Sequence, residues 1–202
     1  MTDTPPCPAI SRGELAGHTT AVLNRGNSRN PDVLLVEVGG RSFVVKDFAP
    51  RDAWVRASIG RWITAREIRA LRALDGLPSV PRFLGSIDPL AFAVEYRPGR
   101  RMSRKLAGRV PPEFPGRLEA ALREMHRRGV AHLDLRHRSN VMVGDDGEPI
   151  LIDFGSALIF RPGSFLARWL LPLLGRIDFA AVEKWRRRLS PSSSDPGPDR
   201  TR

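Results

Sequence analysis

The hydrophobic pattern of the first half of the chain predicts a small sheet interrupted by one helix. Short apolar and β-branched runs predict strands at 19–23, 33–38, 42–48, 82–86 and 92–95, with a helix over 52–74 between the third strand and the fourth. Gly39 and Gly40 separate the second strand from the third, which is typical of an antiparallel hairpin. Ile59, Ile63 and Ile68 place apolar side chains on one face of the helix. We therefore expect the order β-β-β-α-β-β.

After about residue 97 the pattern becomes one of helices and very short strands. Leu118, Leu122 and Met125 share one face of a helix predicted over 113–128. The other predicted elements are a short helical segment near 102–106, strands at 141–143 and 150–153 joined by a turn at 144–147, and a basic helix over 179–189 capped by Asp178. A sheet followed by helices predicts an α+β fold.

Both ends of the chain are rich in Pro, Ser, Asp and Gly, and too poor in apolar residues to offset the entropy of ordering. We expect loose tails at 1–12 and 190–202 around one domain at 13–189. A length of 202 residues suits one folded unit of two lobes, at about 13–96 and 97–189, better than two independent domains.

The composition favours anionic partners and a reducing compartment. The formal net charge of +11 attracts nucleotides, phosphorylated sugars, lipid headgroups or nucleic acid, although an Arg-rich solvated surface gives the same count. The one cysteine, Cys7, excludes an internal disulfide and a cysteine-based metal cluster. The first residues lack a secretory signal, and no segment approaches the roughly 20 apolar residues that span a bilayer. We expect a cytoplasmic protein, either soluble or attached peripherally to the inner face of the membrane.

Four polar motifs follow one another along the chain. Lys46 lies on a predicted strand, Glu67 follows 21 residues later on the predicted helix, HLDLRHRSN occupies 132–140 and DFG occupies 153–155. In this order they resemble the protein-kinase-like superfamily, which has a strand lysine, a helix glutamate, an H-x-D loop ending in Asn and a DFG metal site. The resemblance covers about 19–156. It implies a two-lobed kinase-like fold with a small antiparallel sheet in the N-lobe and a truncated, mainly helical C-lobe.

The resemblance implies ATP as cofactor, and it implies that Lys46 and Arg136 lie near the phosphates of ATP. Lys46 would bind the α- and β-phosphates and stay charged through an ion pair with Glu67, because an unpaired buried lysine tends to lose its proton. A strand lysine more often faces solvent, and Glu37 and Glu95 are alternative partners. Arg136 replaces the lysine that usually faces the γ-phosphate.

The H-x-D loop and the DFG motif supply the oxygens that the resemblance assigns to catalysis and metal binding. Asp134 corresponds to the carboxylate that accepts or orients the proton of the substrate hydroxyl. Asn140 and Asp153 would hold Mg²⁺ or Mn²⁺, which prefer oxygen ligands near phosphates. His132 would brace the loop. Asn140 lies six residues after Asp134, one more than in the family pattern, so the extra residue has to bulge outward.

The expected nucleotide cover departs from the family pattern. No G-x-G-x-x-G is present, and the loop between the first two strands offers only Gly26. Backbone amides of this loop, or Arg25 and Arg29, are the candidates for covering the phosphates. Glu95 and Tyr96 occupy the hinge position between the lobes, where backbone groups recognise adenine. A low affinity for ATP follows from the missing glycines.

The chain continues for only 47 residues after Gly155 and contains no APE element. It therefore looks like the minimal, atypical kinases, either the RIO- and Bud32-like group or the bacterial lipopolysaccharide-core sugar kinases. The apolar segment 165–174 is interrupted by Arg168 and Pro172, which suits an interfacial element beside anionic headgroups. The alternative is a helix that packs under the catalytic loop.

Three functions follow as expectations. The first is transfer of the γ-phosphate to a hydroxyl, with a protein Ser or Thr as the favoured acceptor. The second is a kinase of a lipopolysaccharide-core or other sugar at the membrane surface. The third is a catalytically weak, pseudokinase-like module whose basic surface binds RNA, a ribosomal particle or a membrane. Nucleic acid is disfavoured because the basic stretches lack interleaved aromatic residues.

Overall fold

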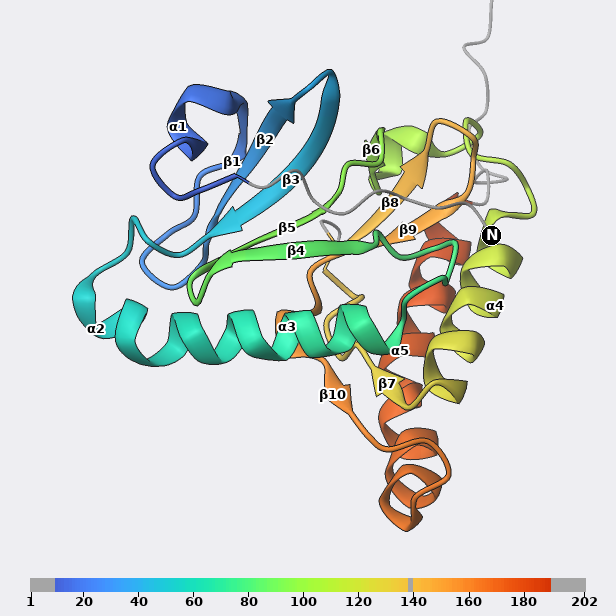
Figure 1. Ribbon diagram of the computed structural model, residues 1–202. Helices are drawn as coiled ribbons and strands as arrows, with labels where there is room; N and C mark the ends of the chain where they lie inside the picture. Colours follow the sequence, from blue (N-terminus) through green and yellow to red (C-terminus); the bar gives the residue numbers. More distant parts are fainter. Residues whose placement is uncertain (1–9, 138–139, 190–202) are drawn as a thin grey trace, which may run out of the picture.

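The N-terminal part of the molecule is an antiparallel sheet, and the C-terminal part is mainly helical (Figure 1). The computed structural model describes residues 10–137 and 140–189. The five-stranded sheet has the order β1 (Thr19–Asn24), β2 (Asp32–Val38), β3 (Arg41–Asp47), β5 (Ala91–Glu95) and β4 (Phe83–Asp88). All neighbouring strands in this sheet are antiparallel. The five predicted strands are therefore confirmed, and the short helix α1 (Leu15–His18) precedes them.

The turn between β2 and β3 explains why the hairpin could be predicted. Gly39 and Gly40 both have positive φ, at 57° and 74°. Two consecutive residues of positive φ match the right-handed twist of the flanking strands, and glycine adopts that conformation without steric cost.

The helix predicted over 52–74 is present as three consecutive segments. They are α2 (Ala53–Val55), the π-helical turn η1 (Arg56–Gly60) and α3 (Arg61–Ala73). The π-helical turn was not predicted. In Figure 1, α3 lies along one face of the sheet. Its buried residues include Glu67, Ile68 and Leu71, so a carboxylate lies among the apolar side chains that face the sheet.

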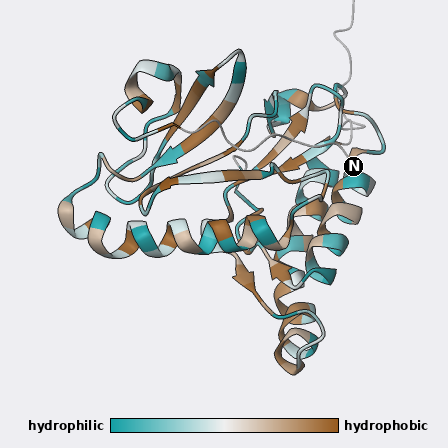
Figure 2. Ribbon diagram, in the orientation of Figure 1, coloured by the Kyte–Doolittle hydropathy of each residue, from teal (hydrophilic) through white to brown (hydrophobic). Residues whose placement is uncertain are grey.

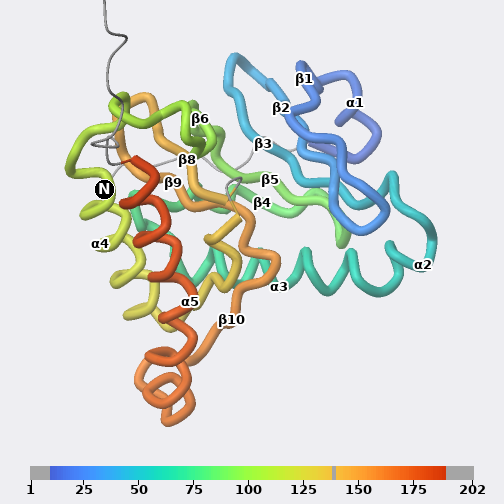
Figure 3. Tube along the Cα trace, turned by 180° about the vertical axis from the view of Figure 1, so that it is seen from behind, coloured from blue at the N-terminus to red at the C-terminus, as the bar shows by residue number. Residues whose placement is uncertain are grey.

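The C-terminal part contains two helices and several short strands. Its elements are β6 (Gly99–Arg101), η2 (Arg104–Leu106), α4 (Phe114–Arg127), β7 (Val130–Ala131), β8 (Val141–Gly144), β9 (Pro149–Leu151), η3 (Phe154–Ser156), β10 (Leu158–Ile159) and α5 (Phe165–Leu189). Strands pair in the order β6-β8-β9, and β7 pairs with β10. Figures 1 and 3 show α4 and α5 side by side, and their residues are in contact.

Three predictions for this part were wrong in detail. The segment near 102–106 is only a single 3-10 turn, η2, that follows the short strand β6. The basic helix does not begin at Phe179 but is the second half of α5, which starts at Phe165. Pro172 removes one helical N–H without ending the helix, and Asp178 therefore lies in the helix interior rather than at a cap.

Two apolar clusters lie on opposite faces of the N-terminal sheet. Phe43 and Val45 of β3 join a small cluster with Leu15 of α1. Val44, on the opposite face, packs against the main cluster, which continues through α3, α4 and α5. Because side chains alternate along a strand, Lys46 shares the face of Val44. The strand therefore points the lysine toward α3 and the C-terminal part.

The segments that flank the domain are described only in part. Arg12 belongs to the predicted N-terminal tail, yet its guanidinium pairs with Asp47 at 2.7 Å and with Asp88 at 2.6 Å. Cys7, with the rest of 1–9, and 190–202 lie outside the described residues. The division into tails and one domain at 13–189 stays a prediction.

Candidate active site

Lys46 lies between two carboxylates that come from distant parts of the chain. Its Nζ donates to Oε1 of Glu67 at 2.7 Å and to Oδ1 of Asp153 at 3.0 Å. Glu67 is the helix partner that was predicted, and Glu37 and Glu95 are not part of the contact. Lys46 and Glu67 are almost fully buried, whereas 54% of the Asp153 side chain is exposed. Asp153 is therefore the accessible member of this cluster.

Burial and charge act on these three groups in different ways. Burial alone would lower the pKa of Lys46, but the charges of Asp153 and Glu67 outweigh it and raise the pKa. The same ammonium lowers the pKa of Asp153. Burial raises the pKa of Glu67, against the pull of Lys46. Glu67 also accepts the backbone N–H of Phe154 at 3.2 Å, so its helix is tied to the DFG motif as well as to the lysine.

Backbone hydrogen bonds link the predicted catalytic aspartate to His137, and His137 to Asn140. The N–H of His137 donates to the carbonyl of Asp134 at 3.2 Å, and the N–H of Asn140 donates to the carbonyl of His137 at 3.2 Å. The side-chain Nδ2 of Asn140 then reaches Oδ2 of Asp134 at 2.8 Å and its carbonyl at 3.0 Å. Asn140 therefore contacts Asp134 although it lies six residues further along the chain.

Asn140 is also joined to the strand that leads to the DFG motif. Its carbonyl accepts the N–H of Ile152 at 3.1 Å, at the end of the β8–β9 hairpin. Asp153 follows directly with φ of 70°, and Leu133, which precedes Asp134, has φ of 69°. Such angles cost a residue with a side chain on the order of 1–3 kcal/mol, and they occur where the surrounding structure imposes them, often in active sites.

Asp178 is a structural member of this region that the sequence interpretation missed. Its carboxylate is completely buried and accepts the backbone N–H of His132 at 2.9 Å and that of Leu133 at 2.8 Å. Nε2 of His126 lies 2.9 Å from the same carboxylate. The detectable signal was spacing, because Asp178, Val182 and Trp185 fall on one helix face and are all buried.

The hydrogen bonds of His132 fix its tautomer. Its Nε2 donates to the carbonyl of Ile152 at 3.0 Å, and its Nδ1 accepts the N–H of Asp134 at 3.4 Å. Because a carbonyl only accepts and an amide only donates, the ring is neutral with its proton on Nε2. Burial lowers its pKa accordingly. The ring also packs against Phe154, with 4.6 Å between centroids, and so joins the catalytic loop to the DFG motif.

Comparison with known proteins shows to which family the chain belongs. A model of the phosphotransferase enzyme family (APH) matches residues 20–139, more than half of the chain. The chain belongs to this family. The matched residues include Lys46, Glu67 and Asp134, whereas Asn140 and Asp153 follow them.

The solved structures give the fold of this phosphotransferase. The Rio2 kinase from Chaetomium thermophilum is similar to it, with a TM-score of 0.61 and 17% sequence identity. The match covers 91% of this chain and 63% of that chain, so the phosphotransferase spans less than two thirds of that kinase's length. At this identity the likeness shows the fold alone, which is that of a kinase. No curated protein matches the sequence.

The remaining predicted site residues of the phosphotransferase differ in their exposure and hydrogen bonds. Arg136 is exposed, and its carbonyl accepts the ammonium of Lys184 from α5. Glu95 ends β5, and its N–H donates to the carbonyl of Arg82 at 2.9 Å. The Glu95 carboxylate accepts the backbone N–H of Arg82 at 3.2 Å. The backbone carbonyl of Glu95 is therefore the group that we expect at the predicted hinge contact. Tyr96 is exposed.

Asp32 and Arg51 hold the backbone of Gly26 in the loop between β1 and β2. Its N–H donates to Asp32 at 2.9 Å, its carbonyl accepts Arg51 at 3.2 Å, and Arg51 also pairs with Asp32. A Cβ at position 26 would lie 2.1 Å from the carbonyl oxygen of Asn30, so only glycine fits. The loop thus has its own scaffold in place of a glycine-rich sequence. Arg25 and Arg29 on it are exposed.

The donor set for a metal consists of oxygens. Among residues 10–137 and 140–189, no three His, Cys, Asp or Glu side chains come together as a metal cluster. Asn140 carries an amide oxygen, which is a ligand type that hard divalent cations accept, and Asp153 offers an accessible carboxylate. Two oxygen ligands beside a triphosphate fit Mg²⁺ or Mn²⁺, which complete their shell with phosphate and water.

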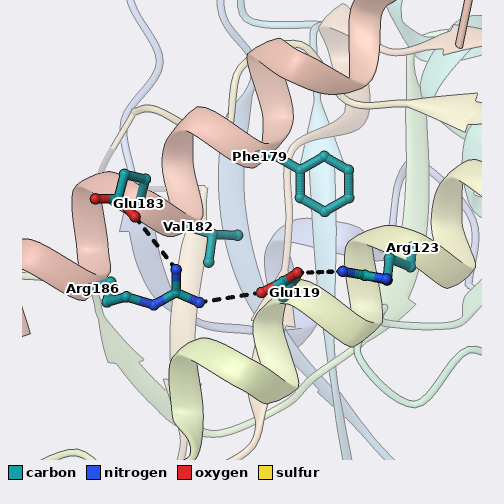
Figure 4. A pocket seen from close by; sticks show the side chains of 6 residues that line it. All are labelled: Glu119, Arg123, Phe179, Val182, Glu183 and Arg186. Atoms are coloured by element: carbon teal, nitrogen blue, oxygen red, sulfur yellow. Dashed lines mark hydrogen bonds and ion pairs between the residues drawn. The ribbon is translucent and has the colours of Figure 1, made fainter. Parts of the chain in front are cut away.

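A surface hollow between α4 and α5 is separate from this centre. It has a volume of about 470 Å³ and is lined by Glu119, Arg123, Phe179, Val182, Glu183 and Arg186 (Figure 4). Glu119 pairs with Arg123 at 2.6 Å and with Arg186 at 3.2 Å. The hollow shares no residue with the Lys46 cluster or the catalytic loop, and its charges neutralise one another.

Proposed function

We propose that the phosphotransferase is an ATP- and metal-dependent kinase that transfers the γ-phosphate to a hydroxyl. The observation that carries the proposal is the position of Lys46, buried between Glu67 and Asp153. A buried ammonium that stays charged and has an accessible carboxylate beside it suits a triphosphate with its metal, because phosphoryl transfer depends mainly on positioning and charge neutralisation.

The chain's own residues divide the work as follows. Lys46 binds the α- and β-phosphates, and Asp134 takes the proton from the acceptor hydroxyl while the new O–P bond forms and the β–γ bridging bond breaks to release ADP. Arg136 faces the γ-phosphate. Mg²⁺ or Mn²⁺, held by Asn140 and Asp153, would supply the remaining positive charge.

The nucleotide's other contacts belong to the same proposal. The loop that contains Gly26 covers the phosphates with its backbone. Glu95 and Tyr96 contact adenine through main-chain groups. Because Asp32 already takes the N–H of Gly26, this cover depends on neighbouring amides and on Arg25 or Arg29. We expect weaker ATP binding than a glycine-rich loop gives.

For the acceptor we place a protein Ser or Thr hydroxyl first, in line with the likeness of the fold to that of the Rio2 kinase. A sugar hydroxyl at a membrane surface is the second candidate, and an exposed apolar stretch of α5 favours it. The chain has a cytoplasmic site of action in either case. None of the described helices has the length and hydropathy needed to cross a bilayer.

Asp134→Ala tests the proposal. With ATP and Mg²⁺ or Mn²⁺, we expect the variant to lose about 10²- to 10⁴-fold of the rate of autophosphorylation or ATP turnover, because the general base is removed. The melting temperature should stay near that of the wild type. Asp145→Ala is the matched control, since Asp145 is an exposed acid in the turn between β8 and β9.

Equal rates in Asp134→Ala and wild type would reject the catalytic assignment. A second measurement separates a kinase from a basic binding module. ATP should raise the melting temperature only when a divalent cation is present, because a ligand that binds the native state stabilises it. A shift that is independent of metal would favour the module.

A further inference from the structure

The first half of α5 exposes apolar side chains in an unusual concentration. We call residues 165–177 the α5 tip. Its exposed large apolar residues are Phe165, Leu166, Trp169, Leu170, Leu173 and Ile177. Figures 1 and 3 show this part of the helix projecting away from the body of the molecule, and Figure 2 shows it as predominantly hydrophobic. Exposed apolar patches of this kind mark interaction sites.

The exposure follows from helix geometry. Leu166, Trp169, Leu173 and Ile177 recur at intervals of three or four residues, so they form one continuous stripe along the helix. The other side carries the small buried residue Ala167 and leads to the anchoring part of the helix. The rings of Phe165 and Trp169 lie together, with 5.9 Å between centroids. Phe165 therefore extends the apolar surface beside Trp169.

The charges around the stripe have one sign. Residues 154–177 contain Arg161, Arg168 and Arg176 but no Asp or Glu. All three arginines are exposed, and no acidic side chain of the described residues pairs with them. An apolar stripe with aromatic rings and flanking arginines is complementary to the boundary between anionic headgroups and acyl chains.

Two other occupants fit this surface less well. A second copy in a twofold dimer would place the same patch against itself, so the arginines would meet arginines without a neighbouring acid. A membrane-spanning arrangement does not fit either, because the tip is short and contains Arg168 and Pro172.

We propose that the α5 tip docks on the surface of an anionic bilayer. Trp169 and its apolar neighbours lie at the headgroup–acyl boundary, and Arg161, Arg168 and Arg176 contact lipid phosphates. The same helix continues to Asp178, which holds the catalytic loop. Docking therefore fixes the orientation of that loop toward the membrane. The proposal does not depend on phosphotransfer, so Asp134→Ala should bind vesicles as the wild type does.

Vesicle flotation of the full chain is the first test. We expect binding to phosphatidylcholine vesicles that contain phosphatidylglycerol to be roughly a hundredfold stronger than binding to phosphatidylcholine alone, because each of three arginines gains from the negative surface. Arg168→Gln/Arg176→Gln should reduce this preference about tenfold or more. Absence of binding to both kinds of vesicle overturns the proposal.

A pair of tryptophan variants locates the contact. Trp169 is 69% exposed and Trp54, on α2, is 66% exposed, so the two offer matched losses of surface. Trp169→Ser should weaken binding to the anionic vesicles at least about tenfold, and Trp54→Ser should not. Equal losses in both variants would show that binding comes from general hydrophobicity and would overturn the proposal.

Two further readouts separate the membrane from a second copy. Brominated lipids should quench part of the tryptophan fluorescence of the wild type, and this part should disappear in Trp169→Phe. Light scattering should show the same molecular mass for wild type and Trp169→Ser. A dimer that Trp169→Ser dissociates, together with no vesicle binding, would assign the tip to a protein contact instead.

Discussion

Two buried charge clusters hold the catalytic region, and they are built in opposite ways. In the first, Lys46 is a single cation shared by the carboxylates of Glu67 and Asp153. In the second, the single carboxylate of Asp178 receives two backbone N–H groups and lies against His126. The first has more acceptors than cations and one accessible member. The second is closed, with its carboxylate completely buried.

The difference indicates what each cluster is for. An arrangement with excess negative charge and an exposed carboxylate is incomplete until a cation arrives, which suits a group that binds a metal with its nucleotide. A buried carboxylate that accepts backbone N–H groups is not accessible to a ligand. The Asp178 carboxylate instead fixes the backbone that precedes Asp134. We therefore propose ligand binding as the role of the Lys46 cluster, and support of the loop as the role of Asp178.

Among changes to the two clusters, the largest expected effect comes from removing the cation of the first. Lys46→Met should lower the rate of phosphate transfer about 10²- to 10³-fold, because a preorganised positive group at the phosphates is lost. Initial rates of autophosphorylation or ATP turnover measure this. Lys105→Met is the control, since Lys105 is an exposed lysine in η2. If Lys46→Met kept most of the activity, the first cluster would be structural like the second.

The second prediction concerns stability. Asp178→Ala leaves the buried N–H groups of His132 and Leu133 without their acceptor, which costs about 1–3 kcal/mol for each group. Urea unfolding should show a loss of about 2–6 kcal/mol in the free energy of unfolding. Glu183→Ala removes an exposed carboxylate from the same helix and should leave the free energy of unfolding close to that of the wild type.

Asp178→Asn sharpens this result, because it keeps one acceptor oxygen. It should fall between Asp178→Ala and the wild type in both stability and activity. A loss in Asp178→Ala no larger than in Glu183→Ala would remove the distinction between the two clusters.

The smallest expected effect is on pH dependence. Burial lowers the pKa of His132 below its ordinary value of 6.5. Below about pH 6.5 the imidazole is therefore protonated in the unfolded chain while it is still neutral in the native protein. The stability that the neutral ring contributes is complete above about pH 6.5 and is lost as the pH falls toward the lowered pKa. The urea midpoint should decrease over this window.

A matched pair of histidine variants isolates this contribution. His132→Gln should flatten the decrease, whereas replacement of the exposed His18 by Gln should leave it unchanged. Asp153, whose pKa is lowered by Lys46, loses its contribution only as the pH falls below its ordinary value of 3.8, so it does not contribute to the decrease that begins near pH 6.5. An unaltered slope in His132→Gln would contradict the assignment of a neutral, buried ring.

The sequence predicted those parts of the fold whose signals are local. The five strands, the helix behind them and α4 follow from apolar periodicity and from the Gly39–Gly40 turn, because these patterns act over a few residues. The start of α5 was misplaced, since Pro172 and the basic residues after Phe179 suggested a break that the helix does not have. The π-helical turn at 56–60 has no pattern of its own.

Within the candidate site, the sequence by itself determined which residues carry charge and in what order, so Lys46, Glu67, Asp134 and Asp153 could be named in advance. Only the tertiary structure decided which of them meet. The meeting of Lys46 with Asp153, and the burial of Asp178 beneath the catalytic loop, depend on contacts between segments far apart in sequence. Hydrogen bonds of this kind form only when the packed core holds both partners in place, and no short pattern encodes them.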